Sequence, residues 1–236
     1  MAKLVEKKPN VAKVAKEEVL IDVAEVTHEA QNWFDKNKKL LLGAAVALVA
    51  IIGGNFLWKN NVASNQKKAV AAMWKAEQQF EKDSFATALS STDLNLPGFQ
   101  QILSKYSSTP AGNVSNLYSA ISYMQLGKFD DAIKFLDAFS PKGEIAPTLK
   151  YGLMADAYSE KKDFSKALKL YKDAANAGSI DDLKAMYLKR FGQLSEVQND
   201  ASSALAAYAE IKSKYPLSND ARDIDKFIAR AEAKKK

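Results

Sequence analysis

The sequence predicts an all-α fold, in which a single N-terminal transmembrane helix is followed by an α-solenoid of paired helices. Two observations support this. Residues 40–58 form one apolar run, and beyond it apolar residues at helical spacing recur with a period near 35 residues. The predicted segments are a disordered tail over 1–16, an amphipathic helix over 17–38, a transmembrane helix over 39–59 and a repeat domain over 60–236.

The run Leu40–Trp58 is long enough to cross a bilayer. It holds no charged residue, and as a helix rising ~1.5 Å per residue it spans roughly 28 Å, close to the hydrocarbon thickness. A buried core helix is the alternative, but such a helix normally carries a polar stripe, and this one has none. A cleaved signal peptide is disfavoured because the preceding 39 residues are too long for its charged N-terminal region.

Lysines predict the orientation of this span. Lys36, Lys38 and Lys39 crowd its N-terminal end, whereas Lys59, Lys67 and Lys68 follow the other end at wider spacing. Because positive charge beside a span is retained in the cytoplasm, we expect a cytoplasmic N-terminus and a C-terminal domain across the membrane.

Small residues form a stripe along the span. Gly43, Ala47, Ala50 and Gly54 recur on one helical face, which would let another helix approach closely in lipid. The alternative is that glycine and alanine are simply common in membrane spans.

The segment before the span changes character near Glu17. The lysine-rich residues 1–16 contain Pro9 and predict disorder. From there to residue 38, apolar residues recur at helical spacing opposite an acidic face, which indicates an amphipathic helix. This helix lies on lipid or docks on a protein. Its acidic face favours a protein, because membrane-surface helices usually carry Lys and Arg.

Composition excludes several classes of function. The net charge of +6 is spread among alternating lysines and acids with only three arginines, which is not a nucleic-acid footprint. There is no cysteine, His28 is the only histidine, and no phosphate-binding glycine loop is present. We therefore predict no enzymatic activity, no cofactor, no metal site and no small-molecule substrate.

Pairs of small residues mark the repeat. Two antiparallel helices approach closely only where Gly or Ala meets a bulky neighbour. Each copy has a small residue, a second one twelve positions later, and a large residue four beyond that. The three copies are Ala120–Ala132–Leu136, Ala155–Ala167–Tyr171 and Gly192–Ala204–Tyr208. This pattern resembles the tetratricopeptide repeat family, over roughly 95–217. The resemblance implies a tetratricopeptide-type α-solenoid closed by a C-terminal capping helix over 219–233.

The resemblance also implies a protein-binding groove lined by the first helix of each pair. The residues projected into it are Leu117, Ile121, Met124, Asp156, Met186, Lys189, Gln193 and Glu196. This groove would be apolar at one end and polar at the other. Leu117, Ile121 and Asp156 stand where co-chaperone repeats carry the Lys and Asn that grip a chaperone's C-terminal carboxylates, so a cytosolic co-chaperone is excluded.

The anchor resembles that of the YfgM-like ancillary subunits of the bacterial Sec translocon. The likeness lies in Asn37-Lys38-Lys39 and in the exit Gly54–Asn60, while a longer tail and a better-formed repeat array depart from that family. The resemblance implies a single-pass inner-membrane protein whose periplasmic domain contacts secretory proteins or periplasmic chaperones beside the translocon. The alternative is a structural adaptor in another envelope complex, such as division, secretion or motility machinery.

Overall fold

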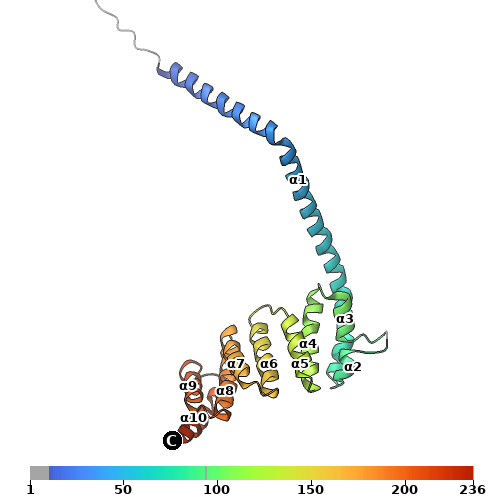
Figure 1. Cartoon of the computed structure of the whole chain (residues 1–236), viewed down its shortest axis with the longest axis vertical. Coiled ribbons are helices and arrows are strands. Elements are labelled where there is room, and N and C mark those ends of the chain that lie inside the picture. Colours follow the sequence, from blue (N-terminus) through green and yellow to red (C-terminus); the bar gives the residue numbers. More distant parts are fainter. Residues whose placement is uncertain (1–10, 94, 236) are drawn as a thin grey trace, which may run out of the picture. The chain divides into compact units, whose positions relative to one another are not determined.

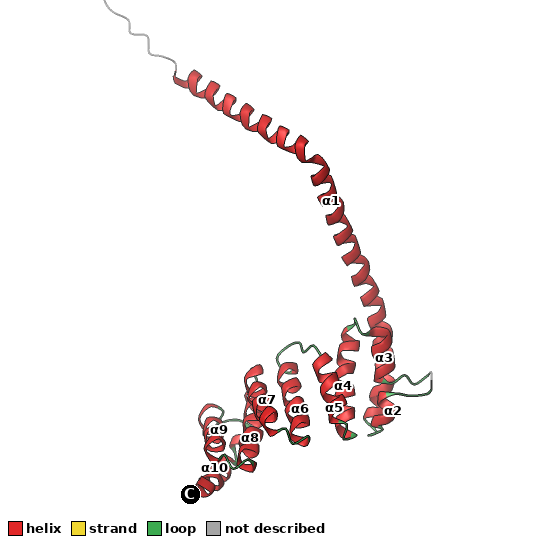
Figure 2. Cartoon of the chain, in the orientation of Figure 1, coloured by secondary structure: helices red, strands yellow, loops and turns green. Residues whose placement is uncertain are grey.

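The computed structural model describes residues 11–93 and 95–235, apart from the side chains of 11–26 and 29. Within these residues the secondary structure is helical, without strands (Figure 2). The elements are α1 Val11–Phe80, α2 Phe85–Leu89, α3 Phe99–Tyr106, α4 Pro110–Gln125, α5 Phe129–Ala138, α6 Ala146–Glu160, α7 Phe164–Ala177, α8 Asp181–Val197, α9 Ala201–Lys214, the 3-10 turn η1 Asn219–Ala221 and α10 Ile224–Lys235. The chain divides into two compact units, with the boundary between Asn60 and Asn61.

The first unit contains the N-terminal part of α1. Its apolar run is helical throughout, and its large side chains face outward, with Ile51 and Phe56 each 70% exposed. The most apolar 18-residue window has a mean hydropathy of 2.3, so by length and composition α1 is able to cross a membrane. The large apolar side chains of this run have no packing partner among the described residues of the first unit.

Helix α1 extends further in both directions than the sequence predicted. Residues 60–65 read in the sequence as a short polar exit after the span, and in the structure the helix continues through them to Phe80. That segment holds no Gly or Pro to break it, and the Asn65 amide donates to Asn61 Oδ1 at 3.3 Å across one helical turn. We also expected disorder to residue 16, whereas α1 begins at Val11. The rest of that tail lies outside the described residues.

The second unit is a row of antiparallel helix pairs, and Figure 1 shows α4 to α10 following one another along it. The same turn joins α4 to α5, α6 to α7, and α8 to α9. Gly127, Lys162 and Asn199 occupy the left-handed region there, with φ of 68°, 61° and 59°. The amide after each one donates to the carbonyl five residues earlier, at 2.8, 2.9 and 2.9 Å. This is the Schellman ending of a helix, placed once per repeat.

A fourth copy of this turn starts the array. Asp83 has φ 56°, and the Ser84 amide donates to Gln79 O at 2.9 Å. Ala76 and Ala88 are buried twelve residues apart, as in the other copies. The end of α1 and α2 are therefore the first helix pair. The motif resemblance covered only roughly 95–217 of a domain predicted over 60–236, so this first pair was not identified as a copy. The chain turns at 81–84, and the array starts within α1.

Two clusters of buried side chains hold the second unit together. Around the first pair, Phe99 of α3 stacks on Tyr118 of α4 with ring centroids 4.9 Å apart, and Phe80 meets Tyr118 edge-on at 5.1 Å. The second cluster runs from α6 to α10 and includes Tyr208, Ile211 and Phe227. The C-terminal helix was expected over 219–233. It is instead the short turn η1 followed by α10, which covers the last pair.

Candidate functional site

A hollow of about 590 Å³ opens across three successive helix pairs. It collects side chains from five helices, because the first helices α4, α6 and α8 lie one behind another and the turn after α4 closes one side. Its lining residues are Met124, Gln125, Gly127, Phe129, Asp156, Ser159, Glu160, Tyr171 and Arg190.

The floor of this hollow is a bonded trio. The Tyr171 hydroxyl donates to Asp156 Oδ1 at 2.6 Å, and Arg190 Nη1 donates to both carboxylate oxygens of Asp156, at 2.5 and 2.6 Å. Burial raises the pKa of the Tyr171 hydroxyl above its ordinary value, the hydrogen bond to Asp156 raises it further, and Arg190 opposes both. Tyr171 therefore stays protonated and donates to the carboxylate.

A second hydrogen-bonded trio joins α8, α9 and α10. The Tyr208 hydroxyl donates to Glu196 Oε1 at 2.8 Å, while Arg230 Nε and Nη2 donate to Oε2 and Oε1 at 2.9 and 2.6 Å. Lys234 adds an ion pair at 3.1 Å. Burial raises the pKa of Glu196, but the bonds from Arg230, Tyr208 and Lys234 outweigh it and lower that pKa to about 2. Glu196 is therefore fully ionised at neutral pH.

The eight projected groove residues are only partly brought together. Met124 and Asp156 line the hollow. Leu117, Ile121 and Met186 are half-buried on the first helices, and Gln193 is exposed. The Lys189 ammonium is committed to Asp220 at 3.1 Å and to Asp223 at 2.9 Å. The Glu196 side chain is 3% exposed and fully bonded, so it holds the array together rather than facing a partner.

Arg190 is the principal residue that the sequence argument missed. The sequence does hold a signal for it. Asp156 precedes Arg190 by 34 residues, and Glu196 precedes Arg230 by the same 34, so that two of the three arginines sit one repeat after a bonded acid. Phe129 and Glu160 were missed because their approach to the hollow depends on the stagger of successive helices.

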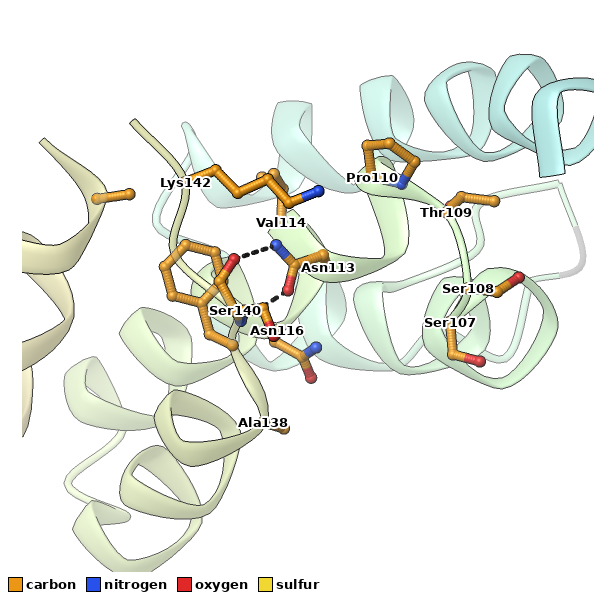
Figure 3. A pocket seen from close by; sticks show the side chains of 12 residues that line it. Ser107, Ser108, Thr109, Pro110, Asn113, Val114, Asn116, Ala138, Ser140 and Lys142 are labelled. Atoms are coloured by element: carbon orange, nitrogen blue, oxygen red, sulfur yellow. Dashed lines mark hydrogen bonds between the residues drawn. The ribbon is translucent and has the colours of Figure 1, made fainter. Parts of the chain in front are cut away.

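Further hollows lie on the second unit, among them two that include the start of α4. One, of about 440 Å³, is lined mainly by Ser, Thr and Asn side chains around the start of α4. In Figure 3 the Asn113 amide exchanges two hydrogen bonds of 2.8 Å with the Ser140 backbone beside it, so this amide is already occupied. The other, of about 260 Å³, lies between α1 and α4, and its rim includes the exposed Val70 and Trp74.

Two predictions concern groups that bind metals or helices. Among the described residues, no group of three or more His, Cys, Asp or Glu side chains is arranged to hold a metal ion. The stripe of Gly43, Ala47, Ala50 and Gly54 faces open space at its glycines, where no described atom lies within 4 Å of an added Cβ. Docking of another helix on this stripe therefore stays a prediction.

Comparison with known proteins identifies the repeat. A family model described as a tetratricopeptide repeat-like domain matches residues 31–219. Two crystal structures of nearly identical TPR-like repeats, assigned to a kinesin light chain of Podosopora anserina, superpose with TM-scores of 0.54 and 0.55. They are 12% and 11% identical to this chain, each covers 72% of it, and it covers 87% and 88% of them, so the likeness concerns the fold. No curated protein matches the chain in sequence.

Proposed function

The chain belongs to the tetratricopeptide repeat-like domain family, and from that premise we propose that it is a protein-interaction module held at a membrane by α1. One observation carries the proposal. The helix that supplies the first half of the first repeat also contains the exposed, uncharged run 40–58. Exposed apolar surface costs about 25 cal/mol per Å² in water, so hydrocarbon is the environment in which this run is stable. The repeats beyond it are left to contact polypeptides.

The binding surface that we propose is the face lined by α4, α6 and α8. Its three acid–base contacts, at Asp156, Lys189 and Glu196, are satisfied within the chain. Leu117, Ile121 and Met124 are half-buried apolar side chains with no such commitment. A partner segment that contributes apolar side chains gains most there, because burying them requires no charge to be stripped of water.

Site-specific photocrosslinking tests this face. A photoreactive side chain at Ile121 is expected to give light-dependent adducts with another polypeptide in intact membranes. The same side chain at Lys134, an exposed position on the second helix of that pair, is the matched control and should give few adducts. Equal crosslinking from both positions would contradict the proposal that this face binds the partner.

We also propose the partner complex and the orientation, on the resemblance of Asn37–Lys39 and Gly54–Asn60 to the YfgM-like subunits. The chain would be an ancillary subunit of the Sec translocon in a bacterial inner membrane. Its N-terminus would be cytoplasmic, and its repeats would be periplasmic and in contact with secretory proteins or chaperones. The lysines that precede the span support this orientation.

Affinity purification from gently solubilised membranes separates this partner from the alternative. Co-purification of the channel subunits supports the translocon. Their absence together with a different stoichiometric complex supports a structural adaptor in division, secretion or motility machinery. Orientation is checked on sealed membranes, where protease added from the cytoplasmic side should leave residues 60–236 intact.

A further inference from the structure

The two acid–arginine contacts between repeats use their arginines differently. Arg230 meets Glu196 with both Nε and Nη2, so its planar fork is filled. Arg190 meets Asp156 through Nη1 alone. Its Nε and Nη2 have no hydrogen-bond partner among residues 11–93 and 95–235. A guanidinium binds a carboxylate best through two parallel N–H groups, and Arg190 keeps such an edge available.

The position of Arg190 makes this edge accessible. Its side chain is 41% exposed and lines the 590 Å³ hollow. The Tyr187 ring centroid lies 5.7 Å from the guanidinium carbon, which helps to hold the plane of the group. Asp156 accepts hydrogen bonds from one Arg190 nitrogen and from the Tyr171 hydroxyl, and these largely offset its negative charge.

The other lining residues of the hollow indicate which groups of a ligand would lie beside its negative charge. Met124 and Phe129 give it an apolar wall, and both are half-buried with surface still open. Gln125 and Ser159 are neutral polar groups. Glu160 is the exposed group that opposes an incoming anion. A ligand that suits these walls carries one carboxylate beside one apolar side chain.

We propose that Arg190 binds the side-chain carboxylate of an acidic residue in a partner polypeptide, with a neighbouring apolar side chain of that partner against Met124 and Phe129. This rests on the proposed function, in that the groove binds polypeptide. The hollow lies midway along the row of first helices, with α4 and α8 on either side, so a bound segment passes through it and presents a side chain rather than a chain end.

The rarity of arginine allows a direct test. The chain has three arginines, so the Nε–H region of a ¹⁵N-resolved NMR spectrum of the full chain in detergent micelles contains one signal each from Arg190, Arg222 and Arg230. The probes are N-acetyl-Leu-Glu-amide and its neutral isostere N-acetyl-Leu-Gln-amide. With the Glu probe, the Arg190 signal should shift saturably while the Arg230 signal stays in place. With the Gln probe, the apparent Kd measured at Arg190 should be at least about tenfold higher than with the Glu probe.

Two variants sharpen the result. Arg190→Lys keeps a charge beside Asp156 but removes the fork, and should weaken binding of the Glu probe about tenfold or more by calorimetry. Glu160→Gln removes the opposing charge and should tighten binding. Arg222→Lys, at an exposed arginine outside the hollow, is the matched control and should change nothing.

Three outcomes would overturn the assignment. They are an Arg190 signal unmoved by the Glu probe, equal shifts from the Glu and Gln probes, or Arg190→Lys binding as well as the unaltered chain. If crosslinking from Ile121 persists in any of these cases, the groove is still supported as a binding face and only the carboxylate site is contradicted. Loss of that crosslinking with a normal Arg190 response would remove the proposed function instead.

Discussion

The ring of Tyr208 fills the space in which a side chain at Gly192 would lie. A Cβ built on Gly192 would be 2.8 Å from Tyr208 Cζ and nearer still to Cε1. The same relation recurs where Tyr187 lies over Gly152. In each case a glycine in a first helix admits a tyrosine ring from a later helix, and the ring is then buried.

Gly192→Ala should therefore destabilise the repeat domain, since its methyl group overlaps a ring that cannot move within the packed core. Overpacking of this kind costs about 1–3 kcal/mol. The measurement is urea unfolding followed by circular dichroism on the full chain in mild detergent. Gly53→Ala is the control, because nothing lies within 4 Å of a Cβ there, and it should leave the transition unchanged. A Gly192→Ala chain as stable as the unaltered one would show that the ring is not confined.

The pH dependence of stability should follow Glu196. Its pKa in the folded chain is lowered from the ordinary 4.5 to about 2, so the folded state favours the carboxylate. The stability that this group contributes is present above pH 4.5 and is lost as the pH falls through about 2. Glu196→Gln should be about 2 kcal/mol less stable at pH 7 and should lose less stability than the unaltered chain on acidification.

An exposed ion pair provides the control for Glu196. Asp130 pairs with Lys161, and its side chain is 84% exposed. Asp130→Asn should change the free energy of unfolding by less than about 1 kcal/mol, since water screens such pairs. If Glu196→Gln behaved like Asp130→Asn at pH 7, the buried trio would not hold α8, α9 and α10 together.

The recurring turn predicts a pair of opposite effects. Lys162 adopts φ 61°, which favours glycine, and Gly127 occupies the matching turn at φ 68°. Lys162→Gly should raise the free energy of unfolding by up to about 1 kcal/mol, and Gly127→Ala should lower it by about 1 kcal/mol. Unfolding curves of both variants check this. Two changes of the same sign would contradict the assignment of these residues to one repeated turn.

The stripe in the span predicts an effect on assembly rather than on folding. Gly43→Ile combined with Ala47→Ile should reduce recovery of the partner complex, because branched side chains keep a second helix at a distance. Leu42→Ile with Val46→Ile is the control, since it changes shape off the stripe with little change in volume. Recovery is measured by affinity purification, and an unchanged yield from the first variant would show that another surface docks the partner.

The sequence predicted those features that depend on local pattern. The apolar run and the paired small residues from Ala120 to Ala204 follow from spacing along one chain. The first repeat was missed for two physical reasons. Its first helix continues from the span without a break. The segment 90–98 and α3 lie between α2 and α4, so the first pair is not followed by the next at a period near 35 residues.

The candidate site was harder to predict because it depends on how helices stack. Met124 and Asp156 follow from the first helix of each pair, and the structure places both in one hollow. Arg190 reaches that hollow only because α8 lies beside α6 with a particular stagger. Glu196 was projected onto the same face, but its burial under Arg230 could not be foreseen without the position of α10.

We propose above all that the run 40–58 of α1 lies in hydrocarbon while the repeats remain in water. Alkaline carbonate extraction of membranes that contain the full chain tests it most directly, because carbonate releases peripheral proteins and leaves spanning helices in the bilayer. We predict that the chain stays in the membrane pellet, and that Leu48→Asp with Val49→Asp moves it to the supernatant. Release of the unaltered chain into the supernatant would contradict the account.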